Sequence, residues 1–351
     1  MSDWLEARNI LVARLDNLGD VVMTGPALRA VKAASPKARI TLLGSRSGVN
    51  AAALLPWIDE TIAYRPLWQH LGDGRSFAPA GDLALIANLK ERNFDAAIIF
   101  TSFSQSPHVP AYLCYLAGIP LRAGESREFA GAVLTDAVSP LPDSVHQVDR
   151  NLHLVEEVGF APVGRELQIR IPDDARSRAV DLLQKHSIDR PFILLHPGAS
   201  APARRYAPHR FGAVARILSR EWPVLVTGTE REVEILAAVR AEAPDVPVLT
   251  GDTDLPTYAA LIERAALVIC NNTLPMHLGD AVRTPLVVLF AGTDEEQQWG
   301  PRSTPARLLR RPTPCAPCYY ITCPIGTPCL DIPVEEVVTV AAALLPVGGA
   351  V

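Results

Sequence analysis

Residues 270–301 read CNNTLPMHLGDAVRTPLVVLFAGTDEEQQWGP and decide the fold expected for this 351-residue chain. An apolar run at 265–270 ends in Asn271, Asn272 and Thr273, a helical segment carrying His277 follows, and a second apolar run occupies 286–290. Strand, polar loop, helix and strand in this order are typical of a parallel sheet with polar residues at its strand ends. A helix N-terminus there offers free N–H groups and a positive dipole end to an anion such as a pyrophosphate.

The same alternation runs along the whole chain. Apolar runs predict strands at 9–13, 39–43, 60–64, 95–100, 192–196, 224–227, 246–249 and 267–270. Helical spacing is found at 21–33, 83–92, 112–117, 148–158, 174–186, 210–220, 230–241 and 257–264. A polar stretch at 165–174 interrupts the pattern. We therefore expect two doubly wound α/β domains facing across a cleft, 1–170 and 171–351, the second with a cysteine-rich loop at 312–331 and a final helix at 334–345.

Composition excludes several classes of protein. Hydrophobic residues make up 48% of the chain and charged residues 20%, which is enough apolar material for buried cores. The formal charge of −5 argues against a nucleic-acid partner, whose binding surface is basic. No apolar run approaches the roughly 18 residues of a membrane span. The polar start MSDWLEARN is no signal peptide, so we expect a cytoplasmic protein. The oligomeric state is not defined by the sequence.

The first candidate site is RLDNLGD at 14–20, between the first strand and the first helix. Gly19 permits a tight turn or a close approach to a ligand. Asp20 stands where the helix begins, and two roles are open to it. It is either an N-cap that satisfies free N–H groups, or a carboxylate base that faces the cleft. Asp16 in the same loop is a rival for the second role.

The second candidate site is HPGASAPARRY at 196–206. Small residues follow the strand end at His196, and Arg204 and Arg205 close the loop. Paired guanidiniums in such a loop suit phosphate binding, although an ordinary solvated pair fits the pattern equally well. The loop is no Walker motif, and no GxGxxG follows the first strand, which weakens a dinucleotide-dehydrogenase interpretation.

The third candidate site is the loop at 271–273 with the helix after it. Thr273 and the N–H groups beyond it could hold a phosphate. His277 lies four residues further on and can face the same site, although a single histidine on a helix also fits a structural role.

Four cysteines form a C-x2-C-x4-C-x5-C pattern at Cys315, Cys318, Cys323 and Cys329. In a cytoplasmic chain this pattern favours a metal over disulfides, and four thiolates suit zinc, iron or an iron–sulfur cluster. Such a site would be structural and would clamp a Pro-rich loop. Reduced or partly paired cysteines are the alternative.

Taken together, these segments resemble glycosyltransferase family 9, the ADP-heptose:lipopolysaccharide heptosyltransferase family. The resemblance extends over nearly the whole chain. It includes ILVARLDNLGDVVMTGPALRAV, HQVDRNLHLVEEVG, LLHPGASAPARRYAPHRF, VLVTGTEREVE and NNTLPMHLGDAVRTPLVVLF. It implies the GT-B architecture, with an acceptor-binding N-terminal domain and a C-terminal domain that binds the nucleotide-sugar. It also implies inverting transfer without a catalytic metal or other cofactor, so zinc or iron at the four cysteines would be structural.

The resemblance also implies roles for individual residues. The aspartate of the Leu-Gly-Asp motif, the general base, falls on Asp20. The diphosphate-binding basic residue falls on Arg204 or Arg205. The donor-binding set is His196, Gly198, Arg204, Arg205, Thr227, Gly228, Asn272, Thr273 and His277. The acceptor-binding set is Asp16, Asn17, Arg46 and Arg122.

Two departures from the family pattern concern the donor side. The usual Asp-Thr/Ser-Gly is Asn272-Thr273-Leu274, which lacks the carboxylate and restricts backbone approach. The segment AGTDEEQQWGP is more acidic than the usual GPTDP-like stretch. The expected reaction is heptose transfer from ADP-heptose to a glycan or lipid-linked saccharide, in the cytoplasm or in peripheral contact with the inner membrane. Another nucleotide-sugar, a natural-product or protein acceptor, an epimerase of the same fold and a non-catalytic binder are the alternatives.

Overall fold

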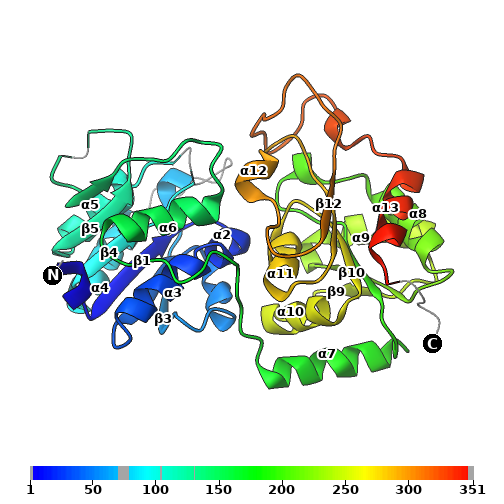
Figure 1. The fold of residues 1–351 in the computed structure, drawn as a ribbon, viewed down its shortest axis with the longest axis horizontal. Coiled ribbons are helices and arrows are strands. Elements are labelled where there is room, and N and C mark those ends of the chain that lie inside the picture. The colour runs from blue at the N-terminus through cyan, green and yellow to red at the C-terminus, as the bar shows by residue number, and fades with distance from the viewer. Residues whose placement is uncertain (1–2, 70–78, 103–104, 130, 347–351) are drawn as a thin grey trace. The chain divides into compact units, whose positions relative to one another are not determined.

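The computed structural model describes residues 3–69, 79–102, 105–129 and 131–346. The chain divides into two units, Met1–Gln168 and Ile169–Val351, shown in blue to green and in green to red in Figure 1. The described residues form two six-stranded sheets, one in each unit, and every strand pairing is parallel. This confirms the α/β, doubly wound GT-B fold class. No helix of the described residues is long and apolar enough to cross a membrane.

The N-terminal sheet has the order β3-β2-β1-β4-β5-β6. Its strands are β1 (Asn9–Arg14), β2 (Arg39–Gly44), β3 (Glu60–Ala63), β4 (Ala96–Ile99), β5 (Leu121–Glu125) and β6 (Asp136–Val138). Its helices are α1 (Asp3–Glu6), α2 (Leu18–Val22), α3 (Gly25–Ala34), α4 (Pro79–Glu91), α5 (His108–Leu116) and α6 (Gln147–Glu157). Helices α3 and α6 contact each other, as do α4 and α5, whose side chains complete an apolar core with β1, β2 and β4.

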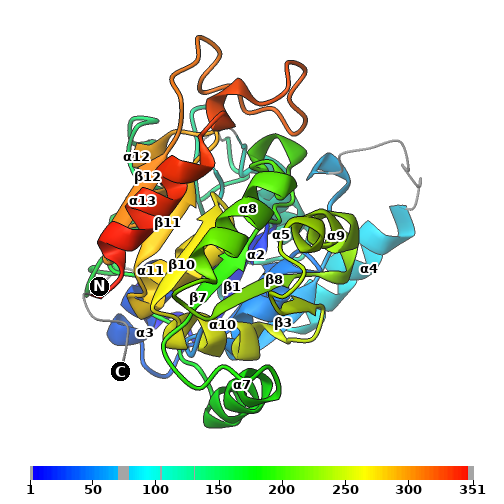
Figure 2. The ribbon, with the colours of Figure 1, turned by 90° about the vertical axis from the view of Figure 1, so that its right-hand side faces the viewer.

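The C-terminal sheet has the order β12-β11-β10-β7-β8-β9. Its strands are β7 (Ile193–His196), β8 (Val224–Gly228), β9 (Val248–Thr250), β10 (Leu267–Asn271), β11 (Leu286–Leu289) and β12 (Ala306–Leu309). Its helices are α7 (Asp173–Lys185), α8 (Pro208–Leu218), α9 (Val233–Glu242), α10 (Leu255–Arg264), α11 (Leu274–Val282), α12 (Glu296–Trp299) and α13 (Val334–Leu344). Figure 2 shows α8 and α13 side by side on one face of this sheet.

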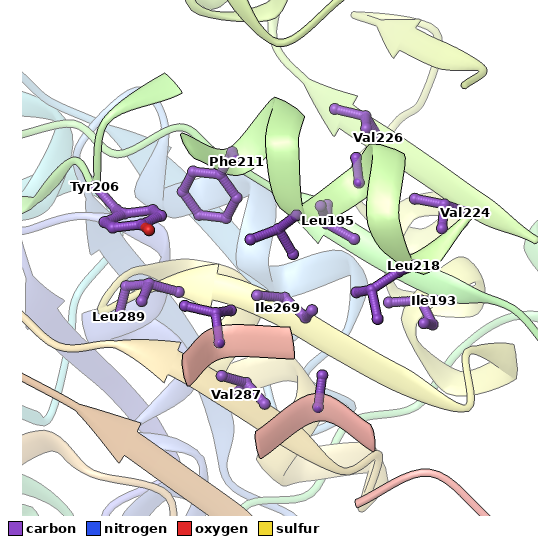
Figure 3. Close-up of a cluster of buried hydrophobic side chains, with 14 of the residues drawn as sticks. Ile193, Leu195, Tyr206, Phe211, Leu218, Val224, Val226, Ile269, Val287 and Leu289 are labelled. Atoms are coloured by element: carbon purple, nitrogen blue, oxygen red, sulfur yellow. The ribbon is translucent and has the colours of Figure 1, made fainter. Parts of the chain in front are cut away.

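The core under α8 and α13 shows why these strands form. Alternate residues of four neighbouring strands, among them Leu195, Val226, Ile269 and Val287, are fully buried and point toward the side chains of α8 and α13 (Figure 3). A side-chain period of two places these residues on one face of the sheet. The opposite face of the central strands is also buried, so they appear in the sequence as continuous apolar runs.

Both sheets follow one topology, and this topology locates the candidate sites. In each unit the chain leaves a central strand in one direction and returns to build the other half of the sheet. The direction reverses between β1 and β4 in the N-terminal unit and between β7 and β10 in the C-terminal unit. Ligands of open parallel sheets bind beyond the carboxyl ends of the strands at such a reversal point.

Some predicted elements differ from those observed. The helix predicted at 21–33 is two helices, α2 and α3, because Pro26 occupies the first turn of α3 and cannot donate the N–H that a continuous helix needs. Strands β5, β6 and β12 were not predicted, because none of them has a continuous apolar run.

Candidate functional site

A buried cation organises the reversal point of the N-terminal sheet. Arg14, the last residue of β1, is fully buried. Its Nε lies 3.1 Å from Asp16 Oδ2, and its Nη2 lies 3.2 Å from Asp20 Oδ1 and donates to Ser102 Oγ at 2.9 Å. Gln105 Nε2, also in the loop after β4, donates to Asp16 Oδ1 at 2.6 Å. Side chains after β1 and β4 therefore form one polar network.

Asp20 has the first of the two roles that the sequence left open, a contribution to helix capping, and its role as a base stays a prediction. The N-cap of α2 is Asn17, and Asp20 stands three residues further on. The Asn17 N–H donates to Asp20 Oδ2 at 3.1 Å, so the carboxylate helps to cap the helix. The Asp20 side chain nevertheless stays 18% exposed, which leaves it within reach of a ligand. Asp16 is 13% exposed; burial raises its pKa, the Arg14 guanidinium lowers it, and the Asp20 charge raises it again, with a net upward direction.

Helix α6 holds the backbone next to this network through two buried side chains. Its residues Gln147 and Asn151 are almost fully buried. Gln147 Nε2 donates to the Thr101 carbonyl in the loop after β4, and Asn151 Nδ2 donates to the Met23 carbonyl after α2, each at 3.0 Å. The segment HQVDRNL, which helped to carry the family resemblance, therefore fixes the loop after β4 and the end of α2, the helix that carries Asp20.

The other predicted acceptor residues are dispersed. Asn17 is exposed beside Asp20, and Arg46 is exposed after β2. Arg122 is buried in β5, and its guanidinium donates to the carbonyls of Ile119, Pro120, Ala132 and Val133. These four bonds give Arg122 a structural role, so we do not include it in the proposed acceptor site.

Asn271 holds the reversal point of the C-terminal sheet together. It ends β10 and is fully buried. Its Nδ2 donates to the Pro197 carbonyl at 2.8 Å, and its Oδ1 accepts from the Tyr206 N–H at 3.0 Å. The loop after β7, which carries Arg204 and Arg205, is therefore attached at both ends to β10.

Asn272 belongs to a buried network that explains the departure at this position. Its Nδ2 donates to Asp294 Oδ2 at 3.1 Å, while its Oδ1 accepts from the Ala291 N–H at 3.0 Å. An ionised carboxylate cannot donate, so it could not replace the first of these bonds. Asp294 also pairs with Arg204 Nη2 at 2.9 Å and accepts from the Thr293 hydroxyl at 2.6 Å.

The two arginines of the loop differ in their partners. Arg204 is neutralised by Asp294, whereas Arg205 donates from Nε to the Ala199 carbonyl and has no carboxylate partner within the described part of the chain. Thr273 is the N-cap of α11, and its side chain makes no capping bond. Pro275 in the first turn lacks an N–H, which leaves this helix end fewer free donors than the sequence pattern suggested. His277 follows one turn into α11 and is 8% exposed.

His196 and its neighbours form a second buried group in the C-terminal unit. His196 Nδ1 lies 3.3 Å from Thr227 Oγ1, and its ring contacts Tyr258 with centroids 5.7 Å apart. Burial lowers the pKa of His196, and the Glu232 charge raises it by less. Gly228 ends β8, where a Cβ would lie 3.0 Å from Leu236. Of the predicted donor residues, His196 and Thr227 are in direct contact.

The predicted metal site is not supported. The described residues, which include all four cysteines of the tail, contain no group of three or more His, Cys, Asp or Glu side chains arranged to hold a metal ion. Cys315 is exposed, whereas Cys329 belongs to the apolar core under α8 and α13. Burial raises the pKa of Cys329, which disfavours the thiolate that zinc or iron would need.

The cysteine-rich loop is instead attached to the donor-side loops by its backbone. The N–H groups of Cys318 and Tyr319 donate to the carbonyls of Gly292 and Thr293 at 3.1 and 2.9 Å, and the Ala203 N–H donates to the Ile321 carbonyl at 2.9 Å. These bonds place the loop beside Asp294 and Arg204.

Four polar partners of the site were not predicted. Ser102 and Gln105 lie in the polar loop after the strand predicted at 95–100, and Asp294 lies in the acidic segment after β11. The position of both loops at a strand end could have indicated these residues. Glu232 accepts from the N–H and hydroxyl of Thr229 next to Gly198. Nothing in the sequence distinguished Glu232 from the charged residues around it.

Comparison with known proteins defines the class. A model of glycosyltransferase family 9 (heptosyltransferase) matches residues 83–327. The chain belongs to this family, and it is a glycosyltransferase.

Particular relatives extend over most of the chain. Lipopolysaccharide heptosyltransferase 2 of Escherichia coli K12 is 26% identical over 318 residues, covering 86% of this chain and 87% of the relative. A family 9 glycosyl transferase from Veillonella parvula DSM 2008 has the same fold, with a TM-score of 0.77, 22% identity, and coverage of 96% and 97%. The E. coli ADP-heptose lps heptosyltransferase II gives a TM-score of 0.76, 22% identity, and coverage of 96% and 98%.

Proposed function

We propose that this enzyme transfers heptose from ADP-heptose to a hydroxyl of a lipopolysaccharide-type acceptor, with inversion at the anomeric carbon and without a catalytic metal. The observation that carries the proposal is the carboxylate of Asp20 at the N-terminal reversal point, fixed by Arg14 and still 18% exposed. The names of the relatives support the donor and the acceptor, since they include an ADP-heptose lps heptosyltransferase.

The proposed reaction is a single displacement. Asp20 accepts the proton of the acceptor hydroxyl while that oxygen forms a bond to the anomeric carbon of heptose. The bond between this carbon and the phosphate oxygen breaks, and ADP leaves with the electron pair. The transition state is oxocarbenium-like, and negative charge builds on the diphosphate.

On the donor side, we assign the stabilisation of the diphosphate to Arg205, Arg204 and the N-terminus of α11. Arg205 is the stronger candidate, because its charge is not neutralised by any carboxylate of the described residues. Arg204 is paired with Asp294 and keeps a side chain that is 31% exposed. Thr273, whose hydroxyl makes no capping bond, can donate to a phosphate oxygen.

The acceptor class sets the proposed place of action. A lipid-linked saccharide is presented at the inner membrane, so the enzyme acts in the cytoplasm, in peripheral contact with that surface. The exposed apolar side chains of α5 support this contact. Val109, Tyr112, Tyr115 and Leu116 are each 44–52% exposed, and tyrosine is typical of membrane interfaces. Sedimentation with vesicles of inner-membrane lipids tests it: wild type should sediment, and a Tyr112→Ser, Leu116→Ser variant should remain in solution.

A second candidate donor follows from the Asn272 network. Because position 272 donates to Asp294 instead of presenting a carboxylate, a nucleotide-sugar other than ADP-heptose is favoured by this one feature. A thermal-shift screen against ADP-, GDP-, UDP- and dTDP-sugars separates the two candidates, since a ligand raises the apparent stability with the logarithm of its concentration over Kd. A shift with ADP-heptose alone supports the first proposal, and a shift with another sugar replaces it.

Turnover is tested with ADP-heptose and lipopolysaccharide that lacks the second heptose. Asp20→Asn should retain donor binding and lose about 10²–10⁴-fold in kcat, the usual contribution of a general base. Arg205→Gln and Arg204→Gln are a matched pair, and the first should weaken donor binding more. Unchanged turnover in Asp20→Asn would exclude Asp20 as the base.

A further inference from the structure

The network around Asp20 contains two charged groups besides the proposed base, a guanidinium and a second carboxylate. A single guanidinium, that of Arg14, lies against two carboxylates, those of Asp16 and Asp20. Arg14 is fully buried, and burying an arginine is costly unless its charge is paired and its N–H groups are bonded. An apolar side chain would pack at the end of β1 without this cost, so we expect the guanidinium to have a further role.

The geometry fixes the guanidinium from two directions. Nη2 donates to Ser102 Oγ at 2.9 Å, and Nε lies 3.1 Å from an oxygen of Asp16, whose other oxygen accepts from Gln105. Neighbouring loops after β1 and β4 thus hold the group through Nη2 and through the ion pair with Asp16, whereas Nε and Nη1 make no hydrogen bond within the described residues. Its remaining contact, 3.2 Å from Nη2 to Asp20 Oδ1, aligns one oxygen of that carboxylate.

The second oxygen of Asp20 is held by the Asn17 N–H at 3.1 Å. Both oxygens therefore have a fixed donor, and the side chain cannot rotate without losing one of the bonds. The carboxylate is presented in one orientation at the reversal point of the sheet.

We propose that Arg14 is a positioning residue for Asp20, which orients its carboxylate, and that Asp16 offsets part of the Arg14 charge. The inference rests on the proposed role of Asp20 as general base. It gives Arg14, which the sequence pattern assigned to no site, a supporting role in proton transfer.

Charges facing Asp20 determine the direction of each expected effect. Within the described residues, the charged groups of this network are Arg14 from β1 and Asp16 from the loop after it, while Ser102 and Gln105 are uncharged. A neighbouring cation favours the ionised form of a carboxyl group, and a neighbouring carboxylate disfavours it. Removing the two charges should therefore move the pH dependence of kcat in opposite directions.

The experiment measures kcat as a function of pH for wild type, Arg14→Gln, Arg14→Lys and Asp16→Asn. Arg14→Gln should lower kcat about 10-fold or more and move the acid limb of the profile upward by about 1 pH unit. Asp16→Asn should move the same limb downward. Arg14→Lys keeps the positive charge but loses the several N–H donors of the planar guanidinium. It should therefore lower kcat and leave the acid limb of the pH profile nearly in place.

Arg150→Lys is the matched control. Arg150 is 4% exposed and pairs with Glu125 at 2.9 Å in the same unit, so it reproduces the burial and the ion pair away from Asp20. It should lower the melting temperature and leave the acid limb unchanged. The KM for ADP-heptose, measured in every variant, should stay near that of wild type.

The outcomes separate the two proposals. If Asp20→Asn is as active as wild type, the general-base proposal fails, and this inference fails with it. If Asp20→Asn is inactive while Arg14→Gln and Asp16→Asn keep the kcat and acid limb of wild type, only the positioning role is overturned. Shifts of the two limbs in the same direction would also overturn it, and Asp16→Asn remains informative if Arg14→Gln does not fold.

Discussion

Gly198 offers a steric test of the donor-side structure. A Cβ at this position would lie 1.8 Å from Glu232 Oε1 and 2.3 Å from Glu232 Cδ, distances that non-bonded atoms do not reach. The backbone of Gly198 is not among the left-handed glycines, so alanine adds no backbone strain of that kind. In Gly198→Ala, the Glu232 side chain must therefore move away.

The cost of that movement can be estimated from the bonds it breaks. Glu232 Oε2 accepts from the Thr229 N–H at 2.8 Å and from the Thr229 hydroxyl at 2.9 Å. Hydrogen bonds to a charged group contribute about 1.5–3 kcal/mol each, and solvent near Thr229 recovers part of this, so we expect a loss of about 2 kcal/mol. For a unit of this size, the melting temperature should fall by about 4–8 °C.

A double-mutant cycle checks the cause by differential scanning fluorimetry and urea unfolding. Glu232→Ala removes the atoms of the clash, so Gly198→Ala should cost less than about 0.5 kcal/mol in that background. Gly81→Ala is the control, because nothing lies within 4 Å of its Cβ position. The reasoning is refuted if Gly198→Ala is as stable as wild type, or if it costs the same with and without Glu232.

Three further predictions concern stability. Asp280 is buried and accepts N–H bonds from residues 302–304 at 3.0, 2.6 and 3.1 Å, so Asp280→Asn should cost about 3 kcal/mol in urea unfolding, and a cost below about 1 kcal/mol would contradict this role. Burial lowers the pKa of His196 below its ordinary 6.5, so the unfolded chain binds the proton more readily; stability is complete above 6.5 and decreases as the pH falls below it. Between about pH 7.5 and 5.5, the melting temperature of wild type should therefore fall more than that of His196→Gln, and parallel curves would be the contrary result. Arg122→Lys should cost about 3 kcal/mol through lost carbonyl bonds, whereas Arg46→Lys at the surface should stay within about 0.5 kcal/mol; equal stability of the two would argue against a structural Arg122.

Strands with continuous apolar runs were predictable because burial on both faces of a parallel sheet appears directly in the sequence. The runs that became β1, β4, β7, β10 and β11 belong to this kind, and the polar residues after them are where the candidate sites lie. Strand β5, with the sequence LRAGE, was missed. Its buried Arg122 and Glu125 resemble surface residues until their partners are known. The partners of Arg122 are backbone carbonyls, which no sequence pattern marks, and Glu125 pairs with Arg150 on another helix.

The candidate site was also predictable only in part. The loops at 14–20, 196–206 and 271–273 were recognisable, because a strand that ends in small and polar residues is a local feature. The pairing of charges within them was not. Sequence alone could not decide between Arg204 and Arg205, and the structure distinguishes them because Asp294, some ninety residues further on, pairs with only the first.

Local patterns by themselves determined that this chain forms two parallel α/β units with polar loops at the strand ends, since apolar periodicity depends on neighbouring residues. Only the tertiary structure decided that Arg14 serves two carboxylates, that Asn272 is bonded to Asp294, and that Cys329 lies in the core. The reason is topological. The strand order places β1 beside β4, and β10 between β7 and β11, and it thereby brings Ser102, Gln105 and Asp294 to polar partners that are distant along the chain.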